Sequence, residues 1–155
     1  MAAAKQRIEQ QPAWVLHTYP WRETSLIVEI FAREHGRVAL VAKGARRPHS
    51  QLRGVLLAFQ PLWMDWSGGG EVKTLVRAEW QGGQPLLIGR ALICGYYLNE
   101  LLVRLTARED PHPRLFDAYA EAVRALGRGE AESPILRRFE LALLQELGYE
   151  AGLAN

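Results

Sequence analysis

The sequence contains a single cysteine, Cys94, among 155 residues. One thiol cannot form an intramolecular disulfide, and it cannot supply the cysteine cluster of a structural zinc site. The four histidines, at positions 17, 35, 49 and 112, are too scattered to match the spacing of metal ligands. We therefore expect neither a metal nor a cofactor. Cys94 falls on an apolar helical stripe, which favours a small buried thiol over a nucleophile.

Long apolar runs are also missing from the sequence. No stretch approaches the roughly 20 residues that are needed to cross a bilayer. The N-terminal "MAAAKQRIEQQ" turns polar too early for a secretory signal. With 48% hydrophobic and 23% charged residues, the composition is that of an ordinary globular protein. These features predict a soluble, cytoplasmic protein of one mid-sized domain or two small ones.

Patterns typical of enzyme active sites are weak. The segment "GGGEVKT" (68–74) lacks the glycine that precedes the lysine of a phosphate-binding loop. A strand pattern follows it, whereas such a loop needs a helix N-terminus behind its glycines. The acidic pair Glu109 and Asp110 lies beside prolines and is typical of a helix end. Because no base, nucleophile and orienting group come together, the sequence predicts a protein that is not an enzyme.

The first half of the chain has the pattern of short β-strands. These segments are rich in Val, Ile, Leu and aromatic residues, and turn residues separate them, including Gly36 and the "SGGG" hairpin at 67–70. The five expected strands are residues 13–19, 25–31, 37–43, 57–66 and 71–80. Five short strands suit a small closed barrel, which has no free edges, and the OB-fold is the first candidate.

The second half changes to helical spacing. Three helices are expected, over residues 86–108, over 114–126, and from Ser133 to the stop at Gly148. Ser133 followed by Pro134 predicts an N-cap and a first helical residue. The predicted fold class is therefore α+β. An N-terminal five-stranded OB-fold β-barrel, residues 1–82, precedes an α-helical bundle domain, residues 83–155.

Positive charge is concentrated in the first half. Residues 1–84 hold 11 Lys and Arg against 7 Asp and Glu, whereas residues 85–155 hold 8 against 10. The segment "VAKGARRPHSQLRG" (41–54) has four Lys or Arg residues and no acid. The simplest interpretation is a solvated loop. The functional one is a loop that contacts phosphates, so that binding would weaken with salt.

A barrel that binds single strands also needs aromatic platforms for the bases. Trp21, in the first turn beside Arg22, is the best exposed candidate. Trp63 and Trp66 lie three apart on one expected strand, so they point to opposite faces and one of them is expected in the core.

The last helix, "ILRRFELALLQELGY" (135–149), is apolar on more than one side and carries adjacent arginines, Arg137 and Arg138. It is either a central bundle helix with two snorkelling arginines or an apolar groove edged by arginine. Such a groove would suit a peptide with acidic and apolar residues.

Four segments in this order resemble the RecO family of bacterial recombination mediators. They are "VLHTYPWRETSLIVEIF" (15–31), "GRVALVAKGAR" (36–46), "GEVKTL" (70–75) and "LRRFELALLQELGY" (136–149). The resemblance implies an N-terminal OB-fold and a helical domain, without catalysis. It implies binding of single- and double-stranded DNA in the nucleoid, strand annealing, and help in loading RecA onto DNA covered by single-strand-binding protein (SSB). The implied protein partners are RecR and the acidic, apolar C-terminal tail of SSB.

The resemblance also implies site residues. The DNA-binding residues that it implies lie on the strand-and-loop region and on "GEVKTL": Arg37, Lys43, Arg46, Arg47, Arg53 and Lys73. Trp21 joins them as the aromatic platform predicted above. The expected contacts with the SSB tail lie on the last helix: Arg137 as the counter-charge, with Phe139, Leu141 and Leu144 near an apolar groove.

RecO proteins usually continue well past the "LGY" segment, whereas this sequence stops at Asn155. We therefore expect it to lack further helices and, relative to some members, a cysteine-bound zinc. Apolar faces left open would then favour self-association. Two other classes fit the basic loop: an adaptor that binds an acidic protein, and an RNA-binding OB-fold protein of the translation machinery. Binding of bare oligonucleotides, DNA against RNA, separates the three.

Overall fold

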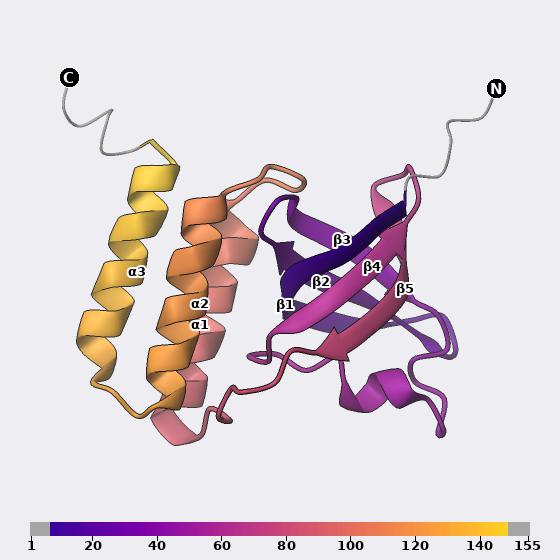
Figure 1. Ribbon diagram of the computed structural model, residues 1–155, viewed down its shortest axis with the longest axis horizontal. Helices are drawn as coiled ribbons and strands as arrows, with labels where there is room; N and C mark the ends of the chain where they lie inside the picture. The colour runs from indigo at the N-terminus through magenta and orange to yellow at the C-terminus, as the bar shows by residue number, and fades with distance from the viewer. Residues whose placement is uncertain (1–6, 149–155) are drawn as a thin grey trace.

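The computed structural model describes residues 7–148 and divides into a barrel and a layer of helices (Figure 1). The strands are β1 (Arg7–Trp21), β2 (Ser25–Ala32), β3 (Gly36–Ala42), β4 (Leu62–Ser67) and β5 (Val72–Trp80). A 3-10 helix, η1 (Gln51–Gly54), lies between β3 and β4. The helices are α1 (Gly89–Leu105), α2 (Pro113–Gly127) and α3 (Glu132–Glu146).

The strands close into a barrel in the order β1-β2-β3-β5-β4. Four of the pairings are antiparallel, including the β1–β4 pair that closes the barrel, and β3 pairs with β5 in parallel. The long β1 takes part on both sides because its first half pairs with β4 and its second half with β2. This is a closed five-stranded barrel of the OB type followed by helices, so the predicted α+β fold class is confirmed.

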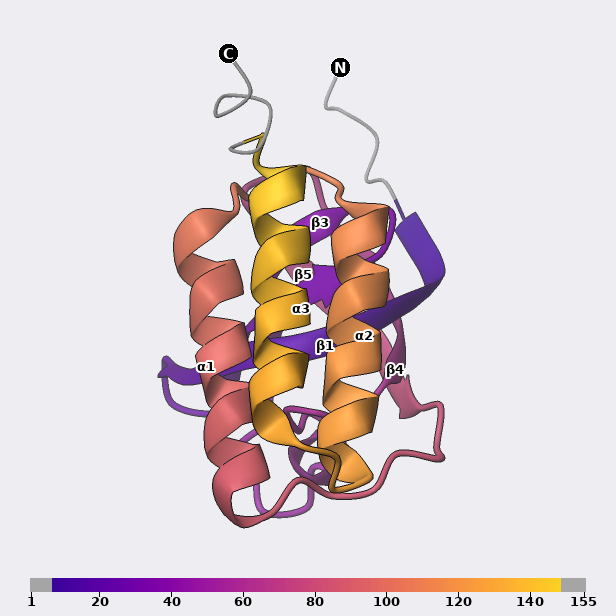
Figure 2. The same cartoon turned by 90° about the vertical axis from the view of Figure 1, so that its left-hand side faces the viewer.

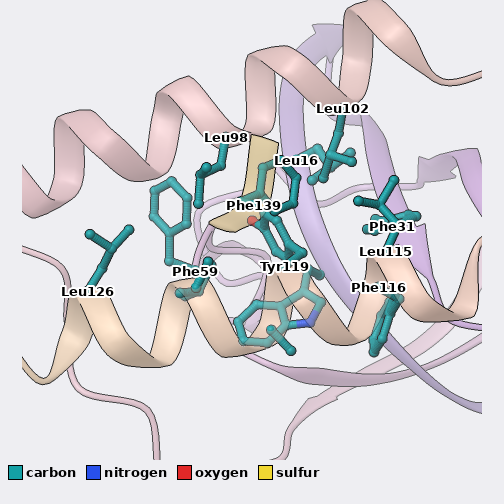
Figure 3. Packing of buried hydrophobic residues seen from close by; sticks show 14 of the residues in the cluster. Leu16, Phe31, Phe59, Leu98, Leu102, Leu115, Phe116, Tyr119, Leu126 and Phe139 are labelled. Atoms are coloured by element: carbon teal, nitrogen blue, oxygen red, sulfur yellow. The ribbon is translucent and has the colours of Figure 1, made fainter. Parts of the chain in front are cut away.

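The barrel wall faces two separate apolar cores. Inward residues such as Val28, Leu40 and Met64 fill the barrel. Outward residues of the barrel strands, Leu16 and Phe31 among them, join a second core with the helices (Figure 3). Because successive side chains of a strand point to opposite faces, one stretch of alternating apolar residues can supply both cores.

Tyr119 of α2 lies at the centre of the second core and is fully buried. Its ring makes edge contacts with Trp14, at 5.5 Å between centroids, and with Phe139 of α3, at 6.2 Å. Its hydroxyl donates a 2.5 Å hydrogen bond to Asn99 Oδ1, and Asn99 in turn donates to the Leu16 carbonyl of β1. Burial raises the pKa of Tyr119, so the phenol stays a neutral donor that links α2, α1 and the barrel.

The linker between α1 and α2 is fastened to the β2–β3 turn. The Glu109 amide donates a 2.8 Å hydrogen bond to the Arg37 carbonyl. Gly36, with φ +71°, lies against the backbone of Asp110, which leaves no space for a Cβ. The helices are therefore held on the barrel at two places, by the Tyr119 core and by this turn. Among them α3 lies farthest from the barrel (Figures 1 and 2).

The ends of some predicted elements are shifted, as in β1 and α1, and two further details are wrong. Residues 57–61 are not a strand, because this connection buries Leu56 in the barrel and Phe59 in the helical core, and Phe59 has φ +66°. Ser133 is not the N-cap of α3: the helix begins at Glu132 after Ala131, and no side chain caps it. The boundary between the two predicted domains stays a prediction, and residues 149–155 lie outside the described part.

Candidate nucleic-acid interface

Arg46 joins the β1–β2 turn to the basic loop after β3. Its Nε donates a 3.0 Å hydrogen bond to the Ser25 carbonyl, and one terminal nitrogen donates to the carbonyls of Arg22 and Glu23, at 2.7 and 2.8 Å. Its backbone amide donates to the Thr24 carbonyl at 2.8 Å. Arg46 is thus a half-buried brace, and the two segments that it ties together form one end of the barrel.

The loop beyond the brace forms a shallow hollow of about 480 Å³ on the surface. Lys43, Arg47 and His49 line it, and all three are exposed. Gly44, at φ +68°, lets the chain turn back so that the Arg47 side chain lies close to its Cα. Two short backbone hydrogen bonds, Arg47 N to Gly44 O and Ser50 N to Arg47 O, hold this turn at 3.0 Å each.

The cations around the hollow form no ion pairs within the described part of the protein. Within residues 7–148, none of Arg22, Lys43, Arg47 and Arg53 makes an ion pair with a carboxylate. Four cations that stay unneutralised on one end of a barrel are available to an external anion.

Trp21 is the last residue of β1 and is 41% exposed. The Arg22 guanidinium lies over its ring, 5.5 Å from the centroid. We call Trp21, Arg22, Lys43, Arg47 and Arg53 the basic-loop surface. Of Trp63 and Trp66, one was expected in the core. Trp66 is that residue, at 2% exposed, whereas Trp63 is half-buried.

Two of the expected DNA-binding residues lie inside the protein instead. All three guanidinium nitrogens of Arg37 donate hydrogen bonds to Glu29 or Thr106, and its side chain is only 10% exposed. Lys73 Nζ pairs with Glu109 at 3.0 Å and bonds to the Gly70 carbonyl. Their burial and bonds do not support direct contacts with DNA, and we leave both out of the basic-loop surface.

Sequence reasoning did not assign Arg22 or Tyr19 to the interface. In the sequence, Arg22 stands out only as the neighbour of Trp21. Tyr19 is the last residue of the strand expected over residues 13–19. The alternation of His17, Tyr19 and Trp21 is the signal that finds Tyr19, once β1 is seen to continue through Pro20.

The four residues expected at the SSB tail do not share one surface. Leu141 and Leu144, 54% and 46% exposed, continue from Arg137 along one side of α3, and we call these three the tail ridge. Phe139 is 1% exposed and faces the core. Arg137 pairs with Glu140, and the hydrogen bond from Tyr97 together with Arg137 holds the pKa of Glu140 below its usual value. Arg138 instead lines a hollow of about 150 Å³ between α2 and α3.

Groups that would carry other chemistry are not assembled in the described chain. Residues 7–148 contain no cluster of three or more His, Cys, Asp or Glu that could hold a metal ion. Burial raises the pKa of the Cys94 thiol, which opposes the thiolate that a nucleophile requires. None of the described helices is both long and apolar enough to span a membrane.

Comparison with known proteins identifies the family. Residues 6–83 match the family of the recombination protein O N terminal region, and residues 89–155 match that of its C terminal region. The chain belongs to the recombination protein O (RecO) family. Proteins named DNA repair protein RecO are similar to it: the one from Aromatoleum aromaticum is 81% identical over 96% of this chain, and the one from Ralstonia nicotianae 60% over 98%.

This chain spans only part of those RecO relatives. It covers 62% of the Aromatoleum aromaticum protein, 63% of the one from Azoarcus sp. and 56% of the one from Ralstonia nicotianae. The high identity over the matched region means that the barrel and the three helices described above have counterparts in those proteins.

Proposed function

We propose that this chain is a non-enzymatic DNA-binding component of DNA repair, whose barrel holds the phosphate backbone of single- and double-stranded DNA on the basic-loop surface. The observation that supports this most is the group of four exposed cations that form no ion pair with a carboxylate of residues 7–148. Phosphate contacts of this kind carry little sequence information, so binding is expected to be independent of sequence. Membership of the RecO family supports DNA as the anion.

Charge neutralisation also supports a role in annealing. Complementary strands repel each other through their phosphates, and a protein that releases counterions from both strands lowers that repulsion. We further propose that the chain assists RecA loading on SSB-coated DNA and acts together with RecR. These two partners follow from the family alone, and we assign no surface to RecR.

The first prediction concerns Lys43 and Arg47. A Lys43→Ala/Arg47→Ala variant is expected to bind a single-stranded oligonucleotide more weakly, and the plot of log affinity against log salt should become shallower by about 1.4 for two lost phosphate contacts. Fluorescence anisotropy of a labelled oligonucleotide across several salt concentrations measures both quantities. Arg46 is kept, since its loss would also disturb the β1–β2 turn.

The matched control is Arg104→Ala/Arg114→Ala, which removes the same net charge from exposed positions on the helices. This control is expected to leave the salt dependence unchanged. An equal change in both variants would mean that net charge alone sets the binding. If the unmodified protein does not bind DNA at low salt, the adaptor function is favoured, and stronger binding of RNA than of DNA would favour the RNA-binding function.

We propose that the tail ridge on α3 receives the C-terminal tail of SSB. Two exposed leucines beside an arginine offer apolar contact and a counter-charge for an acidic, apolar peptide. Arg137 would exchange its pairing with Glu140 for the peptide carboxylates. The hollow beside Arg138 opens on a different side of α3, so the two arginines distinguish two docking sites.

The second prediction is that Arg137→Ala weakens binding of a labelled SSB-tail peptide about tenfold, the usual scale for losing one charged hydrogen-bonding partner. Arg138→Ala, a neighbouring arginine that is also exposed, should have little effect. Fluorescence anisotropy with the peptide measures both variants. The opposite result, a loss only in Arg138→Ala, would place the peptide in the hollow between α2 and α3 and refute the tail ridge.

A further inference from the structure

Three ring side chains lie at alternate positions near the end of β1, and we call them the ring row: His17, Tyr19 and Trp21. Alternate residues of a strand point to one face, here the outer face of the barrel. The rings of His17 and Tyr19 are 5.8 Å apart between centroids, and Tyr19 and Trp21 are 39% and 41% exposed. The ring row is therefore a strip of exposed rings on the outer face of the barrel.

A β-bulge separates this strip from the covered part of β1. The register shifts between Val15 and His17. Leu16, the unpaired residue of the bulge, is 3% exposed and packs in the helical core, whereas His17 is exposed. Bulges re-aim side chains at functional sites, and this one directs the strand out from beneath the helices.

The cross-strand neighbours of Tyr19 are apolar, and the row has cations at its Trp21 end. Tyr19 pairs across the sheet with Ile27, and Ile27 with Val41. Trp21 pairs with Ser25, whose Oγ accepts a hydrogen bond from Gly44 N at 3.3 Å, so the row ends at the basic loop.

The carboxylate that faces the row is already neutralised. Glu29 pairs with His17 across the sheet. One of its oxygens binds Arg37 at 2.9 Å and the other binds Arg108. A phosphate chain that passes over the outer face therefore meets no free acid at this position.

The row also continues into a hollow of about 240 Å³ between β1 and α1, which His17 lines together with Tyr96, Asn99 and Glu100, whose carboxylate pairs with Arg104. Tyr96 is 55% exposed and adds another aromatic face at this end. The strip thus has a cationic end at the basic loop and a partly aromatic recess at the other end.

We propose that the ring row stacks the bases of single-stranded DNA and selects single strands over duplex, while the basic loop holds the phosphates. This inference rests on the proposed DNA binding and specifies which part of the substrate the barrel recognises. Alternate strand residues are about 6.8 Å apart, twice the 3.4 Å step between stacked bases in a duplex strand. Unstacked bases of an extended single strand can match that spacing, whereas the stacked bases of an intact duplex cannot.

The test compares Tyr19→Ala and Trp21→Ala on a single-stranded oligonucleotide and on its duplex at one low salt concentration. Each variant is expected to bind the single strand about tenfold more weakly, as measured for lost base stacking. Binding of the duplex should change by less than about twofold, because its phosphates still reach the basic loop. Fluorescence anisotropy reports both affinities.

Tyr97→Ala is the matched control, because Tyr97 is also 39% exposed but lies on α1 and contacts Glu140 of α3. It should bind both DNA forms normally. Tyr19→Phe keeps an aromatic ring and should bind the single strand as the unmodified protein does. Thermal unfolding followed by circular dichroism verifies that each variant is folded.

Two results would refute the ring row. One is normal single-strand binding by folded Tyr19→Ala and Trp21→Ala, and the other is an equal loss on single strand and duplex. Both differ from failure of the proposed function, in which the unmodified protein binds neither form of DNA.

Discussion

Replacing Arg37 with alanine is expected to lower the free energy of unfolding by about 3–5 kcal/mol, the range for removing one partner of a buried ion pair. Arg37 and Glu29 side chains are 10% and 6% exposed. The variant leaves Glu29 buried with only the half-exposed Arg108, and it removes the donors that bind the Thr106 carbonyl. Urea unfolding followed by circular dichroism measures the change.

The control for this prediction is Arg104→Ala, which removes a 75% exposed arginine paired with Glu100 on α1. Its expected cost is below about 0.5 kcal/mol, as for other exposed pairs within a helix. If Arg37→Ala lowered the free energy of unfolding by less than about 1 kcal/mol, water would have to hydrate the Glu29 carboxylate in place of Arg37. DNA affinity of the folded Arg37→Ala variant should be unchanged, and a clear loss would restore Arg37 as a DNA contact.

Gly36→Ala is expected to cost about 3 kcal/mol, the sum of backbone strain and a steric clash. The residue has φ +71°, where side chains other than glycine are strained. An added Cβ would also lie 2.7 Å from the carbonyl carbon of Asp110, so the linker between α1 and α2 must move away from the barrel. Thermal and urea unfolding of the variant measure the cost.

Gly129 provides the comparison that separates the two causes. It has φ +78°, and nothing lies within 4 Å of a Cβ placed there. Gly129→Ala therefore measures backbone strain alone, about 1 kcal/mol. Equal losses of unfolding free energy at both positions would show that the α1–α2 linker moves away from the added methyl group at no cost. The β2–β3 turn would then not fix the helices on the barrel.

Much of the fold was predictable because alternation in strands and helical spacing are local properties. The barrel strands and all three helices followed from them. The errors occur where tertiary packing decides. Residues 57–61 are apolar like a strand, but Leu56 and Phe59 fill two different cores, which an extended chain with regular alternation does not allow.

The candidate site was predictable only as a region of charge. Lys43, Arg37 and Lys73 are equivalent in a sequence pattern, and their roles depend on acids that are distant along the chain. Arg37 forms an ion pair with Glu29, and Lys73 forms one with Glu109, whereas Lys43 has no ion-pair partner among residues 7–148. The role of the half-buried Arg46 was also not predictable from the sequence. Its partners are backbone carbonyls, which carry no charge and leave no pattern in the sequence.

The position of α3 has a consequence for how the protein would be used. Figure 1 shows η1, which continues the basic loop, at the opposite end of the molecule from α3. A nucleic acid on the barrel and a peptide on the tail ridge would not compete for space. The chain could then bridge a DNA strand and the tail of a protein that still covers a neighbouring part of it. Through such a tether, each binding event would raise the local concentration available for the other.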